Sequence, residues 1–398
     1  MRNTPSEGQG DAASVRGGYL GNTPPTGQLP PRGQRVWVDH PEQLRKAVER
    51  LVQAPIIAID AEFTQARSHT QNEATGPRLA LLQLAIEGEC YVVDALRLRN
   101  LEALNTVVEN PAYSVLLHGA GADLRVMAER GLKVAHYFDL EATSRSIFGQ
   151  HESSLAAMLQ RAFNAHLDKS LQRTDWTRRP LPPAMVAYAA RDAEMTLALF
   201  YWLKEHFGWA LHLHESTNLQ EPVADWIEPF LHGSMPFPAD VVVTEAMKQG
   251  TVRDQEQIYA DCREALHTLS HPMRKSRLLR LITDLSLVNL IPEISLLLQA
   301  PTADERAAAA RALSRLNIEE TRELIAPLLQ DPVQDVRKAA QTAVRFSTSS
   351  KETRTAWTTP ERRADGARSW TVGEAVTSEE NTDDGDDWRA RLRSFMNE

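Results

Sequence analysis

Four acidic residues and a tyrosine lie in three short blocks whose residue types suit metal-assisted chemistry. Asp60 and Glu62 end the apolar run IIAIDAEF, and Asp123 follows the glycines of SVLLHGAGADL. Tyr188 and Asp192 lie four residues apart in MVAYAARDAEMTLALF. Carboxylate oxygens are the ligands that Mg²⁺ and Mn²⁺ prefer, and two such ions about 3.5–4 Å apart promote phosphodiester cleavage. The three blocks therefore indicate a metal-dependent phosphodiester-cleaving site.

The elements that carry these residues must bring them together. Because side chains alternate along a strand, Asp60 and Glu62 point to one side of it. Helical periodicity places Tyr188 one turn before Asp192, where its hydroxyl can hold or polarise an attacking water. We expect Asp123 to come from the next element.

Each block also has a structural explanation when it is taken alone. Strands often end in solvated acids, Asp123 after its glycine turn is typical of a helix N-cap, and Tyr188 and Asp192 could lie on the surface of an ordinary helix. The occurrence of all three blocks in order, each in the expected element, favours a site.

The surrounding pattern predicts an α/β domain over residues 35–212. Short apolar runs bounded by turn residues predict buried strands, namely IIAIDAEF, LALLQLAI, CYVVDAL and YSVLLHG. The first three are close together, which favours antiparallel hairpins, whereas later strands need helical crossovers. We therefore expect a mixed sheet with helices on its faces.

The rest of the chain is predicted to be helical between two tails. Residues 297–313 and 328–344 align at an offset of 31 residues, with identical Leu, Gln, Pro, Asp, Arg and Ala positions, and resemble HEAT-like repeats. Two copies are too few to be stable alone, so we expect them to lean on the preceding helices. The predicted regions are a disordered tail over 1–34, a helical linker over 213–265, HEAT-like repeats over 266–347 and a disordered acidic tail over 348–398.

The last residues, DWRARLRSFMNE, have apolar side chains at helical spacing and arginines opposite, as in Trp388, Leu392, Phe395 and Met396. Such a short helix is either a frayed end or a helix that docks on a partner.

Composition narrows the class of protein. A net charge of −9 argues against a protein that coats nucleic acid by bulk electrostatics, although a local basic channel remains compatible. Two cysteines exclude a disulfide framework and a four-cysteine zinc site. No apolar run approaches about 18 residues, so we expect a cytoplasmic protein without a membrane span.

Residues 36 to 212 resemble the catalytic domain of ribonuclease D, in the DEDD superfamily of 3′–5′ exonucleases. The matching motifs are Asp60-x-Glu62, HGAGADL, and the tyrosine form of the third motif within LDKSLQRTDWTRRPLPPAMVAYAARDAEMTLAL. The resemblance implies a ribonuclease H-like fold and release of nucleoside monophosphates from a 3′ end with two Mg²⁺ or Mn²⁺ ions. It also implies that Asp60, Glu62, Asp123 and Asp192 ligate the metals and that Tyr188 positions the water.

Two features depart from the ribonuclease D pattern. The polar segment TQARSHTQNEATGPRLALL, between Glu62 and Gln83, is longer than expected and borders the site, so it bears on substrate preference. The helical domain that usually docks RNA is not recognisable, and the HEAT-like repeats, which could instead engage a protein partner, follow in its place.

Substrate contacts are predicted from a local basic and aromatic cluster. Lys169, Arg173, Arg178 and Arg179 surround Trp176, a mixture that suits phosphate neutralisation and base stacking. Alternatively, Trp176 fills the core and the segment is a solvated loop.

Gln83 and His118 lie near the first two motifs and are expected to touch the terminal nucleotide. His118 is equally well explained as a packed histidine at a strand end.

Three functions compete. The first is a 3′–5′ exoribonuclease acting on the ends of structured or stable RNA, which it would bind as single-stranded 3′ ends. The second is a 3′–5′ DNA exonuclease similar to Werner-type exonuclease domains, which the same catalytic motifs would serve. The third is a non-catalytic binding scaffold, against which the complete set of acids and the tyrosine count.

Overall fold

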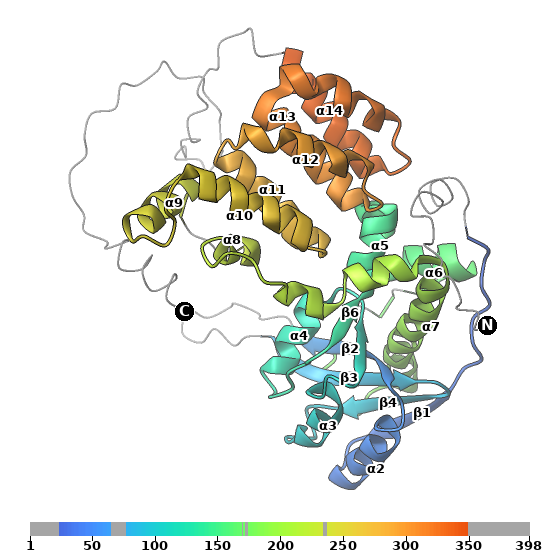
Figure 1. Ribbon diagram of the computed structural model, residues 1–398. Coiled ribbons are helices and arrows are strands. Elements are labelled where there is room, and N and C mark those ends of the chain that lie inside the picture. The colour runs from blue at the N-terminus through green and yellow to red at the C-terminus, as the bar shows by residue number, and fades with distance from the viewer. Residues whose placement is uncertain (1–23, 65–76, 169, 172–173, 234–236, 349–398) are drawn as a thin grey trace, which may run out of the picture.

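The computed structural model describes residues 24–64, 77–168, 170–171, 174–233 and 237–348, which form a sheet-containing domain and a helical region (Figure 1). The sheet has six strands in the order β1-β4-β3-β2-β5-β6. Pairs β2–β3 and β3–β4 are antiparallel, whereas β1–β4, β2–β5 and β5–β6 are parallel. The expected mixed sheet is confirmed. Its strands are β1 (Gln34–Val38), β2 (Ile56–Thr64), β3 (Arg78–Ile86), β4 (Glu89–Asp94), β5 (Ser114–Leu117) and β6 (Tyr137–Asp139).

Connection lengths explain the strand directions. A tight turn at Gly88, whose φ of 79° suits a residue without a Cβ atom, joins β3 and β4 as a hairpin. The parallel strands β5 and β6 are reached through helices, because a parallel pair needs a crossover. These crossovers contain α3 (Asn105–Val108) and α4 (Ala120–Ala128).

Two helical layers cover the sheet. Ile57 and Ile59 of β2 pack with α2 (Pro41–Leu51), α3 and α4 in one apolar core. Ala58, between them, packs with the long helix α7 (Pro183–Leu213) in a second core on the opposite face. Because side chains alternate, Asp60 and Glu62 share the face of Ala58 and lie on the side of α7. Helices α5 (Leu140–Phe148) and α6 (Leu155–Phe163) also contact α7.

The N-terminal boundary differs from the expected one. The Gly27 N–H donates to the Ala162 carbonyl at 2.7 Å, and Leu29 packs against Leu159 and Met195. The predicted tail, residues 1–34, is therefore too long, because residues 24–33 already contact α6 and α7. The remainder of that tail, and the C-terminal tail with its terminal helix, lie outside the described residues.

The helical region has one shared core. Trp226, Val243 and Ile258, from the predicted linker, pack in the same apolar cluster as Leu313 and Val336 of the predicted repeats. The expectation that the repeats lean on the preceding helices agrees with this packing. The helices predicted as a linker, residues 213–265, instead share a core with the repeats. The helices are α8 (Glu228–His232), α9 (Ala239–Lys248), α10 (Gln255–Thr268), α11 (Pro272–Asp284), α12 (Ile291–Leu296), α13 (Ala303–Ile325) and α14 (Gln334–Thr348).

The two aligned copies have equivalent hydrogen bonds. The Arg306 Nη1 group donates to the carbonyls of Ala300 and Pro301, at 2.9 and 3.0 Å. Thirty-one residues later, Arg337 Nη1 donates to the carbonyls of Asp331 and Pro332, at 2.5 and 2.8 Å. The internal repeat thus has a structural counterpart, while its assignment to the HEAT-like class stays a prediction.

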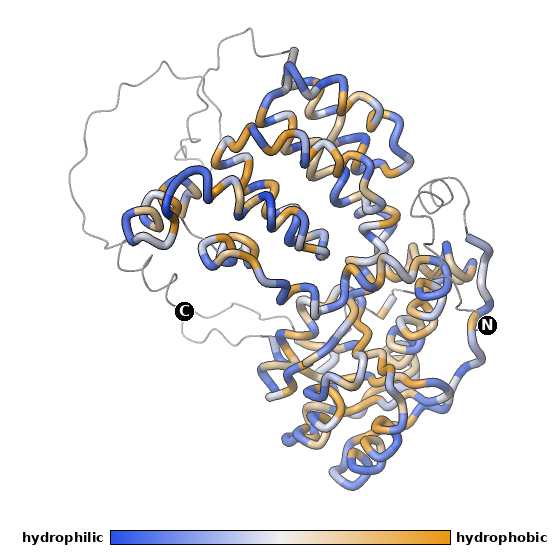
Figure 2. Tube along the Cα trace, viewed as in Figure 1, coloured by the Kyte–Doolittle hydropathy of each residue, from blue (hydrophilic) through white to orange (hydrophobic). Residues whose placement is uncertain are grey.

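Apolar and hydrophilic residues are mixed along the helices (Figure 2). Over the described ranges, no helix combines the length and apolar character needed to cross a membrane.

Candidate active site

Three of the predicted acids meet between the sheet and α7. Asp60 and Glu62 come from β2, and Asp192 comes from α7, which crosses the same face of the sheet. One carboxylate oxygen of each lies within 4.8 Å of those of the other two. A single cation can therefore be held by all three side chains, which come from two segments far apart in the sequence.

Asp123 faces the same cluster from α4. The helix begins after Gly119, whose φ of 82° is left-handed, and Asp123 follows four residues later with 8% of its surface exposed. The N–H groups of Gly119 and Ala120 donate to the Asp139 carboxylate, at 3.1 and 3.2 Å. The alternative in which Asp123 caps its helix is therefore wrong, because Asp139 does so.

Burial and mutual repulsion make protonation of the acids favourable in the metal-free protein. Burial, then Asp60, Asp192 and Asp123, raise the pKa of Glu62 to about 9. Burial, followed by the charges of Asp60 and Asp139, raises the pKa of Asp123 to about 8, and burial raises that of Asp60 to about 6. A divalent cation would offset the repulsion between the ionised acids, and its binding would release the protons that they hold.

This electrostatic arrangement predicts how stability depends on pH. The folded protein holds more protons than the unfolded chain between about pH 4, the ordinary carboxyl value, and pH 9, the pKa of Glu62. We therefore expect the melting temperature of the metal-free protein to fall as pH rises through this window. Thermal melts in EDTA and in Mg²⁺ at pH 6 and pH 9 measure this change in melting temperature. Mg²⁺ should raise the melting temperature more at pH 9 than at pH 6. Glu62→Gln should flatten the profile; a wild-type profile equally flat would contradict the explanation.

Tyr188 stands beside the acids with its hydroxyl protonated. It lies one helical turn before Asp192 on α7, and its ring packs against Trp176 with centroids 6.0 Å apart. Burial, then Asp192, Glu62 and Asp60, raise the pKa of its hydroxyl above the ordinary value. A neutral hydroxyl next to a metal site can orient a water molecule, which agrees with the predicted role.

The structure places the predicted substrate contacts differently. Trp176 is only 3% exposed and belongs to the core under α7, so its ring is not available for base stacking; the core-filling alternative holds. Gln83 pairs with Asp60 in the sheet register and is fully buried, so it borders the acids from within the sheet. His118 is partly buried, and its Nε2 atom is 3.1 Å from the Ser153 carbonyl oxygen, as expected for a packed histidine.

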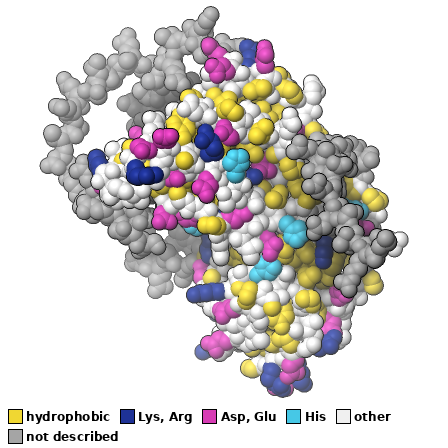
Figure 3. All heavy atoms as spheres, viewed as in Figure 1, with side chains coloured by type: hydrophobic (Ala, Val, Ile, Leu, Met, Phe, Trp, Pro, Cys, Tyr) yellow, Lys and Arg dark blue, Asp and Glu magenta, His cyan; other side chains and the backbone are white. Residues whose placement is uncertain are grey.

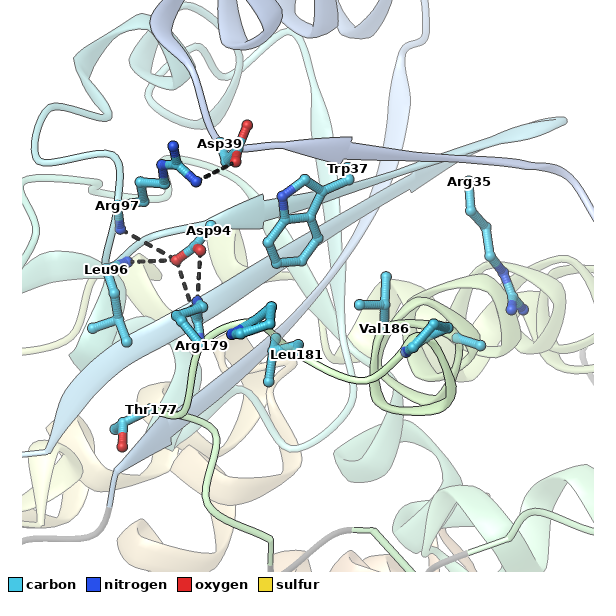
Figure 4. A pocket seen from close by; sticks show the side chains of 13 residues that line it. Arg35, Trp37, Asp39, Asp94, Leu96, Arg97, Thr177, Arg179, Leu181 and Val186 are labelled. Atoms are coloured by element: carbon cyan, nitrogen blue, oxygen red, sulfur yellow. Dashed lines mark hydrogen bonds and ion pairs between the residues drawn. The ribbon is translucent and has the colours of Figure 1, made fainter.

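The basic cluster of the sequence is partly structural. Lys169 and Arg173 lie outside the described residues, and Arg178 is exposed. Arg179 forms a two-pronged ion pair with the buried Asp94, through Nε at 2.6 Å and Nη2 at 2.7 Å (Figure 4). This pair fixes the segment that leads into α7 onto the end of β4.

A pocket of about 990 Å³ opens beside this ion pair (Figure 4). Trp37 lines it together with apolar side chains of the segment before α7. Two further arginines on its wall are also paired, Arg35 with Glu194 and Arg97 with Asp39. The pocket is therefore mainly apolar, with its guanidinium groups neutralised.

Asp139 is a positioning residue that the sequence analysis missed. Besides holding Gly119 and Ala120, its carboxylate accepts the N–H groups of Glu141 and Ala142 as the N-cap of α5. One side chain thereby caps two helices. The Asp before LEATSRSIF is a recognisable N-cap signal for the second helix, but nothing local reveals the first.

Removal of this double cap should destabilise the domain. We expect Asp139→Ala to lower the free energy of unfolding by about 2 kcal/mol, because each lost cap typically costs about 1 kcal/mol. Urea unfolding at pH 6, where Asp123 is neutral, measures this without repulsion from that acid. Asp139→Asn, which keeps one acceptor oxygen, is the matched variant and should lose less. Equal losses for the two variants would show that the caps are not responsible.

Comparison with known proteins defines the class of this domain. Residues 35–207 match the 3′–5′ exonuclease family. Among its relatives, the exosome complex exonuclease RRP6 of Saccharomyces cerevisiae is 34% identical over 190 residues, 46% of this chain and 25% of the relative. The ribonuclease D of Gluconacetobacter diazotrophicus is 31% identical over 166 residues, 41% of each chain. The ribonuclease D-like resemblance is thereby confirmed. The chain spans less than half the length of these curated relatives.

Solved structures are also similar. The catalytic core of RRP6 from Trypanosoma brucei is 19% identical with a TM-score of 0.42, covering 85% of this chain and 86% of that one. Escherichia coli ribonuclease D is 20% identical with a TM-score of 0.40, covering 80% of this chain and 76% of that one.

Proposed function

We propose that this protein is a metal-dependent 3′–5′ exoribonuclease that releases nucleoside monophosphates from single-stranded 3′ ends. The observation that carries the proposal is the convergence of Asp60, Glu62 and Asp192 within 4.8 Å, in a domain of the 3′–5′ exonuclease family. Asp123 and Tyr188 border this group from α4 and α7. All five residues named from the sequence are thus available to one site.

The donor set fits hard divalent cations. Three clustered carboxylates and a fourth nearby offer oxygen ligands only, as Mg²⁺ and Mn²⁺ prefer. Burial and the neighbouring carboxylates raise the pKa values of Glu62 and Asp123, so a bound cation would have negative charge to neutralise. We propose that Asp60, Glu62, Asp123 and Asp192 hold two such ions, which activate water and stabilise the leaving oxygen. The Tyr188 hydroxyl donates a hydrogen bond that orients the attacking water. The burial of the acids keeps the site in a low-dielectric environment, which strengthens these interactions.

RNA is the favoured polymer because the relatives include ribonuclease D and RRP6. DNA is the second candidate, since the DNA polymerase I of Aquifex aeolicus is 27% identical over 164 residues. RNA differs from DNA by its 2′-hydroxyl group, and contacts with that group would let an enzyme distinguish the two polymers. On the face in Figure 3, acidic and basic side chains are interspersed rather than separated by sign, so this face offers no continuous basic surface to either polymer. A protein partner for the helical region and a cytoplasmic location stay predictions.

A direct assay tests the proposal. The full-length protein is incubated with single-stranded RNA and DNA oligonucleotides, labelled at the 5′ or the 3′ end, with Mg²⁺, Mn²⁺ or EDTA. We expect 5′-labelled RNA to shorten in single-nucleotide steps and 3′-labelled RNA to release labelled mononucleotide at once. Faster decay of DNA would select the second candidate. Binding without cleavage of either polymer would favour the scaffold.

A further inference from the structure

A second polar pocket lies between the exonuclease domain and the two repeat copies. It has a volume of about 400 Å³ and is lined by the end of α5, the first turns of α13 and the first turns of α14. Three cationic side chains, Arg145, Arg311 and Lys338, line it together with two carboxylates, Asp304 and Asp335. We propose that this pocket binds backbone phosphates of the RNA strand whose 3′ end occupies the acid cluster, an inference that rests on the proposed exonuclease function.

The walls of the pocket are held by equivalent residues of the two copies. Asp304 and Asp335 are 31 residues apart and occupy the same position in the repeat. The Ser146 hydroxyl donates to Asp304 Oδ2 at 2.6 Å, and the Gln150 N–H donates to Asp335 Oδ2 at 2.6 Å. Both helices therefore rest on residues 145–151 with the same face toward α5, which fixes the spacing of the cations.

Close approach at Gly149 supports this packing. Its φ is 90°, and a Cβ atom added there would lie 2.7 Å from Val333 Cγ1 and 2.8 Å from Asp335 Oδ2. A residue other than glycine would push the second repeat copy away. The junction is thus a close-packed contact, and the pocket is a space left within it.

The cations of the pocket are only partly neutralised. Across the described ranges, Arg311 forms no ion pair, and Arg145 Nε is as far as 4.0 Å from Asp304 Oδ2. Lys338 Nζ lies 3.2 Å from the His151 ring nitrogen, which is not an acid. Asp304 and Asp335 accept hydrogen bonds from the uncharged Ser146 hydroxyl and Gln150 N–H, and Asp335 Oδ1 also lies 3.9 Å from His151 Nε2. The N-terminal turns of α13 and α14 add positive dipole ends. A phosphate group would provide an anionic partner for the unpaired guanidinium of Arg311 and for the ammonium of Lys338.

The position of the pocket suits a strand that leads to the acids. Helix α5 begins directly after Asp139, which caps the helix that carries Asp123. Arg145 lies six residues beyond Asp139, roughly 9 Å along a helix that rises 1.5 Å per residue. Arg145 thus lies about 9 Å of helix away from the residue that caps the acid-bearing helix, a separation that a few nucleotides of single strand can span.

Binding measurements on the full-length chain test this inference. All proteins carry Asp60→Asn to prevent cleavage, and fluorescence anisotropy reports binding of labelled single-stranded RNA of two and of twelve nucleotides. The test variant adds Arg311→Gln and Lys338→Gln. The matched control adds Arg322→Gln and Lys248→Gln, two exposed residues outside the pocket that change the net charge equally.

The test variant should bind the longer RNA about tenfold more weakly than the control, with a smaller loss for the dinucleotide. The slope of log affinity against log salt should become shallower by about 1.4, since each lost contact with a single strand contributes roughly 0.7. Equal affinities of test and control variants for the longer RNA would overturn the inference. Loss of binding to polyglutamate without loss for RNA would also overturn it and identify an acidic protein partner. Failure of the wild-type protein to degrade RNA would contradict the proposed function, independently of the result of this binding test.

Discussion

Replacement of Asp60 by Asn should reduce metal-dependent RNA degradation by more than about 100-fold, while the metal-free protein stays folded. Asp60 lies within 4.8 Å of Glu62 and Asp192, so its loss removes one proposed ligand and part of the charge that attracts the cation. Even partners that only orient a metal ligand typically contribute 10–100-fold, so a ligand itself should contribute more. Initial rates on 5′-labelled single-stranded RNA over a range of Mg²⁺ or Mn²⁺ concentrations measure the effect.

The stability of the same variant separates a lost ligand from a lost fold. Asp60 raises the pKa values of Glu62 and Asp123, so its neutralisation removes repulsion from a partly buried cluster. In EDTA at pH 8, the variant should melt at the same temperature as the wild type or higher. Asp284→Asn, at an exposed position on α11, is the matched control and should leave activity and melting unchanged. An inactive variant that also melts much lower would show that the fold was damaged and that the ligand assignment has no support from this variant.

The second large effect is expected at Tyr188. Tyr188→Phe should slow turnover by about 100-fold, the lower end of what a positioned proton donor or acceptor contributes. The phenyl ring keeps the contact with Trp176, so the change removes only the hydroxyl group. Since that hydroxyl is protonated and is not a proposed ligand, the metal concentration giving half-maximal activity should change little. Single-turnover rates at saturating metal measure the chemical step.

Helix α7 offers a matched control for this variant. Tyr201 lies on the same helix, is partly exposed and interacts with Glu87 away from the acid cluster. Tyr201→Phe should leave the rate unchanged. If Tyr188→Phe turned over as fast as Tyr201→Phe, the water-positioning role would be wrong, although the metal ligands would be unaffected.

The arrangement of the acids was accessible from the sequence because it depends on local periodicity. Alternation along a strand puts Asp60 and Glu62 on one face, and a four-residue spacing puts Tyr188 and Asp192 on one side of a helix. The mixed sheet followed from short connections between early strands and longer ones between later strands. These features need only knowledge of which residues are neighbours along the chain.

The remaining features depend on contacts between distant segments. The basic and aromatic segment around Trp176 has the composition of a base-stacking site, but the packing of α7 buries the Trp176 ring against Tyr188. Asp139 caps a helix that begins nineteen residues before it, which no local pattern reveals. Likewise, polar and proline-rich residues 24–33 predicted a tail, yet Gly27 forms a backbone hydrogen bond with α6. Low apolar content did not prevent these residues from contacting a preformed surface.

The shared anchoring of the two repeat copies on residues 145–151 has a consequence for how the molecule opens. Local unfolding usually proceeds in cooperative units whose limits follow the contacts. Here, release of the repeats would free the Gln150 amide from Asp335 and would also uncover α5, whose first residues are tied to the helix of Asp123 by Asp139. The Gln150 amide should therefore exchange hydrogen with solvent at the rate at which the repeats detach. A domain cut off at residue 212 would lack this protection and would be more dynamic than the same domain in the full chain.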